Sequence, residues 1–178
     1  MQNDDGYLII PGDEPPNELL IAVETEISSS SGKCGPNGKQ LMQFGVKRPP
    51  ESWFQEYLGC SSSDAKKTVE TRVRSFNNNR LGRYVPGPPG TVLIYRAATR
   101  QGLSPSTGFF NVIPGSHRMT AAEIKRARSV PITLTARDIL FISANTTIEY
   151  VTSGESMALC EALSASLKSE YDDSSMEI

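Results

Sequence analysis

The sequence predicts a mainly β domain with flanking helices. Short β-branched and aromatic runs recur after residue 90, and 14 glycines and 12 prolines fall between apolar runs along the chain. Turn-forming residues between short strands are typical of β-sandwiches and barrels. A chain of 178 residues can form one domain with its own core. We expect that domain to span residues 1–163, followed by an acidic, flexible tail over residues 164–178.

The first ninety residues predict one strand and three helices. Apolar residues at helical spacing follow Asn17, which could cap a helix. Pro36 should form a turn at the end of a polar, glycine-rich loop. The expected elements are a strand over Tyr7–Ile10 and helices from Asn17 to Ile27, from Glu51 to Leu58, and from an Asp64 cap to Phe76.

The second half predicts six short strands and one helix. Thr120 could cap the helix, which is expected between Met119 and Arg128. The expected strands are Thr91–Arg96, Gly108–Ile113, Ile132–Thr135, Ile139–Ser143, Thr146–Val151 and Met157–Leu163.

Composition and charge exclude several classes of protein. A formal net charge of −2 argues against a basic nucleic-acid-binding protein, and no run approaches the roughly 20 apolar residues of a membrane span. The acidic N-terminus lacks the features of a signal peptide, which favours the cytosol or the nucleus. Three irregularly spaced cysteines support neither a disulfide framework nor a closed zinc site.

The chain contains a single histidine, His117. An iron site of the two-histidine, one-carboxylate kind needs two imidazoles, so this chain cannot supply its ligands. A histidine-rich zinc site fails for the same reason. No cysteine lies in a recognisable nucleophile context that would indicate a Cys-His hydrolase.

A basic stretch precedes the strand-rich half of the chain. Its cations are Lys66, Lys67, Arg72, Arg74, Arg80 and Arg83, with Glu70 as the only acid among them. On the predicted helix this stretch would form a solvated face, and it could also contact an anionic partner.

The segment from Phe109 to Arg118 predicts a strand that ends in a tight turn. The turn contains Pro114, Gly115, Ser116 and His117, and we expect the side chains of Ser116 and His117 to tie it by hydrogen bonds. This "PGSH" string resembles the strand-to-turn signature of phytanoyl-CoA-dioxygenase-like proteins, a branch of the Fe(II)/2-oxoglutarate dioxygenases.

Further segments carry the same resemblance over about half the chain. "DGY" at residues 5–7 is similar to the opening of such proteins, and "LTARDILF" at residues 134–141 is similar to a later hairpin, with Arg137 replacing the usual glycine. The resemblance implies a double-stranded β-helix, the jelly-roll or cupin-like fold.

The motifs that would bind iron and 2-oxoglutarate are missing. The resemblance places a His-x-Asp pair before the Thr91 strand, where the sequence reads "SFNNNR", and a second histidine near Thr147. It also places a 2-oxoglutarate-binding arginine near Met157. The chain is therefore expected to be a degenerate member, a pseudoenzyme that uses neither iron nor 2-oxoglutarate.

Three functional hypotheses follow. The first is a non-catalytic accessory subunit or small-molecule-binding protein, which the resemblance associates with natural-product pathways, acting as a homodimer or a heterodimer with a related dioxygenase. The second is a metal-independent enzyme, for which the candidate residues are Tyr95, Arg96, Asp138, Glu149 and Tyr150. The third is an interaction module that uses the basic helix face.

Overall fold

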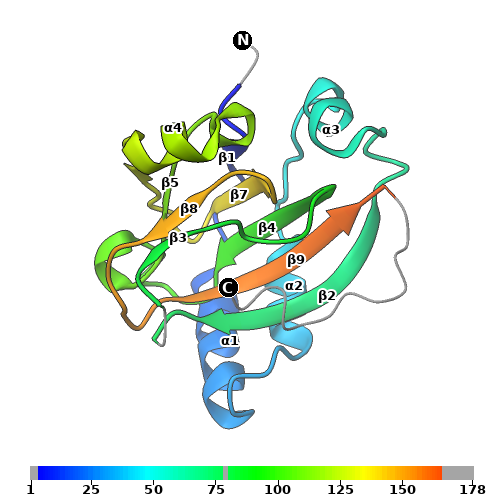
Figure 1. The fold of residues 1–178 in the computed structure, drawn as a ribbon. Coiled ribbons are helices and arrows are strands. Elements are labelled where there is room, and N and C mark those ends of the chain that lie inside the picture. The colour runs from blue at the N-terminus through cyan, green and yellow to red at the C-terminus, as the bar shows by residue number, and fades with distance from the viewer. Residues whose placement is uncertain (1–3, 78–79, 166–178) are drawn as a thin grey trace.

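Two antiparallel β-sheets form the body of the protein, for which the computed structural model describes residues 4–77 and 80–165. The five-stranded sheet has the order β1-β7-β4-β9-β2, and the four-stranded sheet has the order β3-β8-β5-β6 (Figure 1). The strands are β1 (Tyr7–Pro11), β2 (Lys66–Ser75), β3 (Gly82–Tyr84), β4 (Thr91–Ala97), β5 (Asn111–Val112), β6 (Val130–Pro131), β7 (Asp138–Ser143), β8 (Ile148–Tyr150) and β9 (Met157–Ser164).

From β2 onward the chain passes back and forth between the two sheets. Strands β2, β4, β7 and β9 lie in the larger sheet, and β3, β5, β6 and β8 lie in the smaller one. Each paired strand is antiparallel to its neighbours. This is the double-stranded β-helix that the sequence predicts, a mainly β fold with flanking helices.

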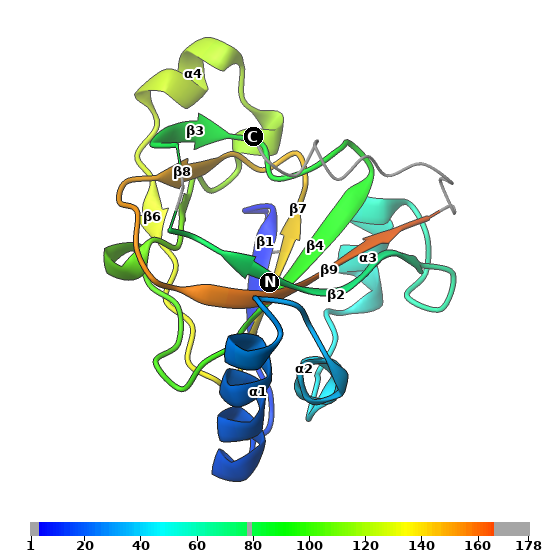
Figure 2. The same ribbon diagram turned by 90° about the horizontal axis from the view of Figure 1, so that it is seen from below.

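Three helices cover the outer face of the larger sheet. Helices α1 (Asn17–Ser29), α2 (Pro36–Gln43) and α3 (Glu51–Leu58) bury their apolar residues against the outward side chains of β4, β7 and β9. Figure 2 shows α1 and α2 on one side of this sheet, and α4 (Ala121–Arg126) on the far side with the smaller sheet. No helix within the described residues is long and apolar enough to cross a membrane.

Alternation along the strands of the larger sheet separates two cores. On β4, Leu93 and Tyr95 point between the two sheets, whereas Val92 and Ile94 point toward the helices. The core between the sheets is rich in aromatic rings, including Phe76, which is fully buried.

The predicted helix from Asp64 to Phe76 is wrong, because this segment forms strand β2. Two register shifts, between Lys67 and Val69 and between Val69 and Arg72, interrupt its pairing with β9. A bulge adds a residue and resets the two-residue alternation of a strand, so the apolar positions took on the spacing of a helix. The basic helix face is therefore wrong as well: Lys67 lies on the outer face of a sheet, and Arg74 points between the sheets.

Other local predictions also need correction. Pro36 begins helix α2, although a turn was expected, and the Glu26 carboxylate of α1 accepts hydrogen bonds from the N–H groups of Gly35, Asn37 and Gly38 at its start. This contact between two helices could not be predicted from local sequence. Asn17 does not cap α1, whose N-cap residue is Pro16.

The strand predictions hold in position more than in length. Strands β1, β4, β7 and β9 lie where they were expected, but Gly108–Ile113 contributes only the two residues of β5. The run Ile132–Thr135 contributes one isolated bridge, between Leu134 and Leu103. Thr120 caps α4 through a capping box with Glu123, as expected. Residues 166–178 of the predicted tail lie outside the described residues.

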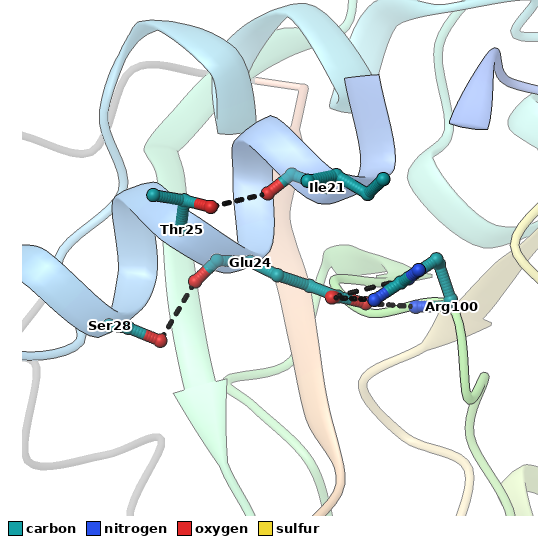
Figure 3. A network of polar contacts seen from close by, with 5 residues as sticks. All are labelled: Ile21, Glu24, Thr25, Ser28 and Arg100. Atoms are coloured by element: carbon teal, nitrogen blue, oxygen red, sulfur yellow. Dashed lines mark hydrogen bonds and ion pairs between the residues drawn. The ribbon is translucent and has the colours of Figure 1, made fainter. Parts of the chain in front are cut away.

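An ion pair joins helix α1 to the loop after β4. The Glu24 carboxylate accepts hydrogen bonds from the backbone N–H and the guanidinium of Arg100, with a shortest distance of 2.7 Å (Figure 3). These hydrogen bonds lower the pKa of Glu24. The hydroxyls of Thr25 and Ser28 donate to carbonyls one turn earlier in α1, so they need no partner outside the helix.

A buried arginine joins the helical layer to the sheet. Arg96 of β4 is fully buried, and its guanidinium donates to the carbonyl oxygens of Leu41 at 2.7 Å, Phe44 at 2.5 Å and Ala136 at 3.1 Å. Burial lowers the pKa of Arg96 to about 10, so the side chain still carries its charge at neutral pH. The residue thus adds a charged donor to the carbonyls of Leu41 and Phe44 at the end of α2, the first of which also accepts from the N–H of Phe44.

Replacing Arg96 with methionine should strongly destabilise the protein. Methionine fills much of the volume but leaves three carbonyl groups without their charged donor, and we expect the free energy of unfolding to fall by about 3 kcal/mol or more. Chemical denaturation measures this change. The control is Arg137→Met, which changes an exposed arginine next to Ala136. It should change the free energy of unfolding by no more than about 0.5 kcal/mol. Equal effects of the two substitutions would contradict the role given to Arg96.

Candidate functional site

The Pro114–His117 segment forms a tight turn against the N-terminal end of the chain. Gly115 adopts a left-handed conformation with φ of 72°, and its N–H donates to the Asp5 carbonyl at 2.9 Å. Close by, Gly6 leaves no room for a side chain, because a Cβ there would lie 2.1 Å from the Thr146 hydroxyl. The two motifs that carried the resemblance, "DGY" and "PGSH", therefore pack on each other.

Within this turn, Ser116 and His117 behave differently. The buried Ser116 hydroxyl accepts a hydrogen bond from the Thr147 N–H at 2.7 Å. The hydrogen bonds expected of His117 are wrong, since neither ring nitrogen has a partner within the described residues. The His117 ring packs edge-on against the Tyr57 ring, with 5.4 Å between the ring centres. Burial lowers the pKa of His117, which favours the neutral form. His117 supports the turn by packing.

Two of the five candidate catalytic residues lie together between the sheets. Tyr95 of β4 and Tyr150 of β8 are both buried in the core between the sheets. The ring of Phe110 lies between them, with its centre 5.5 Å from that of Tyr95 and 6.0 Å from that of Tyr150. Arg96 follows Tyr95 in the same strand and points to the opposite face. It is a structural residue of the helical layer.

The two candidate carboxylates lie elsewhere. Asp138 accepts hydrogen bonds from the backbone N–H and the hydroxyl of Thr135, both at 2.8 Å, and so closes the turn before β7. Glu149 accepts from the hydroxyl of Ser129 and pairs with Arg83 at 2.9 Å; these contacts lower its pKa. Neither carboxylate contacts Tyr95 or Tyr150, so the structure does not assemble the acid-base group of the enzyme hypothesis.

Arg74, which belongs to the basic stretch of the sequence, lies beside both tyrosines. The guanidinium of Arg74, in the edge strand β2, donates to the Tyr150 hydroxyl at 3.2 Å and lies 5.6 Å from the centre of the Phe76 ring. No carboxylate within the described residues forms an ion pair with it, and the buried Tyr95 hydroxyl has no hydrogen-bond partner there. Its position could not be predicted while β2 was expected to be a helix.

The protonation states of this cluster follow from its burial. Burial raises the pKa of Tyr95 well above its ordinary value and also raises that of Tyr150, so both remain neutral phenols. Burial raises the pKa of Cys160, which faces the same interior, to about 11. Arg74 therefore carries the positive charge of a cluster that contains two phenols and a thiol. Such a cluster can bind an anion but offers no general base at neutral pH.

The interior does not fit the iron that the resemblance associates with this fold. In the segment where the resemblance places a His-x-Asp pair, the ring of Phe76 packs against that of Phe109, with 5.1 Å between the ring centres. His117 lies in the outer turn and contacts Tyr57. Residues 4–77 and 80–165 contain no group of three or more His, Cys, Asp or Glu side chains that could hold a metal ion.

Comparison with solved structures supports the fold. The epimerase SnoN from nogalamycin biosynthesis, described as non-heme and alpha-ketoglutarate dependent, is 13% identical, with a TM-score of 0.58 over 90% of this chain and 78% of that chain. HygX from Streptomyces hygroscopicus, solved with nickel and 2-oxoglutarate, is 11% identical, with a TM-score of 0.57 over 90% of this chain and 83% of that chain. AviO1 from Streptomyces viridochromogenes is 11% identical, with a TM-score of 0.55 over 91% and 90%.

These similarities define a class of fold. The chain has the cupin-like double-stranded β-helix of non-haem 2-oxoglutarate-dependent enzymes. Sequence identities of 11% to 13% carry the comparison no further than the fold. No protein-family model and no curated protein sequence matches the chain.

Replacing Ser116 with alanine tests the turn. The buried N–H of Thr147 would lose its acceptor, and we expect the free energy of unfolding to fall by about 1 to 3 kcal/mol, measured by chemical denaturation. Ser106→Ala, which removes an exposed hydroxyl from another turn, is the matched control and should be close to neutral. A neutral result for Ser116→Ala would show that the turn does not depend on this hydrogen bond.

Proposed function

We propose that this chain is a non-catalytic, degenerate relative of the phytanoyl-CoA-dioxygenase-like proteins that binds a small carboxylate-bearing molecule between its two sheets. The observation that carries the proposal is Arg74, a guanidinium turned between the sheets with a phenol as its hydrogen-bond partner and no described carboxylate beside it. A cation in such a place attracts an anion, and a planar guanidinium matches a carboxylate in geometry.

The surrounding phenols support the same ligand class. The hydroxyl of Tyr95 is buried without a hydrogen-bond partner within the described residues, which is costly unless a ligand accepts its hydrogen bond. A carboxylate held by Arg74 would supply that acceptor. Arg74 also pairs in register with Ala158, so it lies next to the position at which the resemblance expected a 2-oxoglutarate-binding arginine.

The missing iron ligands give the proposal its non-catalytic character. One histidine in the whole chain cannot form the two-histidine, one-carboxylate site. The structural neighbours SnoN and SnoK come from nogalamycin biosynthesis, and this supports a role in a natural-product pathway, where the protein would bind an acidic intermediate or assist an active relative.

A specific surface favours association with another chain as a second candidate function. Strand β3 lies at the edge of the smaller sheet, and its pairing with β8 aligns Gly82 with Tyr150. Leu81, just before Gly82, and Val151, just after Tyr150, are exposed apolar residues with 61% and 45% of their surface accessible. An unpaired edge with exposed apolar residues suits a second β-chain, in a homodimer or with a related dioxygenase.

Binding of 2-oxoglutarate and succinate tests the carboxylate site. Isothermal titration calorimetry on the metal-free protein should detect at least one of these probes, and Arg74→Met should weaken its binding by about tenfold or more, because one charge-assisted contact is lost. Arg137→Met, an exposed arginine, should have no effect.

Two results would contradict this proposal. The first is equal binding by the protein and its Arg74→Met variant. The second is one tightly held iron per chain after anaerobic incubation with Fe(II) and desalting, which would return the protein to the metal-dependent class.

Light scattering tests the association. We expect the purified protein to be a dimer, and Leu81→Asp to convert it to a monomer by placing a charge in the apolar contact. Val46→Asp changes an exposed valine on the opposite side of the molecule and should leave the dimer intact. A monomeric protein that also fails to bind a co-expressed dioxygenase relative would rule out this candidate function.

A further inference from the structure

A pocket lies outside the barrel, between the helical layer and the outer face of the larger sheet. It has a volume of about 260 Å³. One side is formed by α2, α3 and the loop between them, which contribute Met42, Val46 and Phe54. The other side is formed by strands β4, β7 and β9. The pocket is separated from the Arg74 cluster by the sheet itself, since the two lie on opposite faces of it.

One row of side chains crosses the sheet at the base of this pocket. In the register of the strands, Glu161 of β9 pairs with Ile94 of β4, which pairs with Phe141 of β7, and all three line the pocket. A carboxylate therefore stands in line with two buried apolar side chains.

The carboxylate is held by two donors. Oε1 of Glu161 accepts from the ammonium of Lys67 at 3.0 Å and from the hydroxyl of Thr71. The Glu161 side chain is 9% exposed and that of Lys67 is 31% exposed. Oε2 of Glu161 accepts no hydrogen bond from the described residues, and the Lys67 ammonium has donors to spare beyond the one it uses.

Stability alone does not explain this arrangement. A buried ion pair usually stabilises a protein no better than apolar side chains of the same size, because both charges lose their hydration. The residues in register with Glu161 on the neighbouring strands, Ile94 and Phe141, are already apolar. A polar pair with unused hydrogen-bonding capacity at one end of an apolar pocket suits the recognition of a ligand.

We propose that this pocket binds a small neutral molecule with an apolar body and a hydroxyl group. The hydroxyl would donate to Oε2 of Glu161 and accept from Lys67, and the apolar body would contact Ile94 and Phe141. An amine would be attracted by Glu161 but repelled by Lys67 and by Arg48, which also lines the pocket, and a carboxylate would be attracted by the two cations but repelled by Glu161; either charge would also lose its hydration. A hydroxyl uses both partners of the ion pair without bringing another charge out of water.

Three probes of one skeleton test the proposal: 2-phenylethanol, 2-phenylethylamine and phenylacetate. Binding is followed by titration of the protein's amide NMR signals. We expect 2-phenylethanol to shift the signals of Ile94 and Phe141 and to bind about tenfold more tightly than the two charged probes. Glu161→Gln leaves the Lys67 ammonium unpaired in a pocket of unchanged shape, so phenylacetate should become the tightest of the three.

Matched variants locate the site. Val46→Trp places a large ring at the pocket and should weaken binding of 2-phenylethanol by about tenfold or more. Val130→Trp makes the same change at an exposed valine of β6 and should leave binding unchanged. Arg74→Met should also leave it unchanged, which separates this proposal from the carboxylate site.

Three outcomes would overturn the inference. Tighter binding of the amine or of phenylacetate to the unmodified protein would mean that the pocket selects a charged ligand. Binding that Val46→Trp does not weaken would place the site elsewhere. The absence of any signal shift at millimolar concentrations of all three probes would show that the pocket takes no ligand of this class.

Discussion

The helical layer depends on one buried cation. Arg96 rises from the centre of the larger sheet and donates to carbonyls at the end of α2 and in the loop before β7. It forms no ion pair within the described structure, so carbonyl dipoles stabilise its charge, with a further coulombic contribution from Glu14. Because Arg96 fixes the end of α2, it also fixes the loop that contributes Val46 to the outer pocket. A strand residue thereby sets the geometry of the helical side of that pocket.

The two faces of the larger sheet place two arginines in different chemical surroundings. Arg96 donates to three carbonyl oxygens through Nε and Nη1, and only its Nη2 lacks a partner among the described residues, whereas Arg74 donates to the hydroxyl of Tyr150 and lies over the ring of Phe76. An arginine whose donors are used holds structure together, and one whose donors remain available can hold a ligand. The proposed carboxylate site therefore uses Arg74, whereas Arg96 holds the helical layer to the sheet.

The turn motif and the barrel interior are held by separate contacts. Gly115 and Ser116 tie their turn to the N-terminal strand and to the residue before β8, and these contacts do not involve the barrel interior. Aromatic rings, among them that of Phe76, line the interior. Packing constraints on the turn and chemical constraints on the interior are therefore independent, which is consistent with a retained "PGSH" motif beside missing metal ligands.

The sequence by itself determined the fold class, the positions of β1, β4, β7 and β9, and the capping of α4, because these depend on alternation, turn residues and caps within a few positions of one another. It did not determine β2, since two bulges hide the strand's alternation. Only the tertiary structure showed that Tyr95 and Arg96, adjacent in sequence, face opposite layers. It also brought Arg74 to Tyr150 and Lys67 to Glu161, because residues 76 and 94 positions apart meet through strand pairing and sheet packing, which no local pattern encodes.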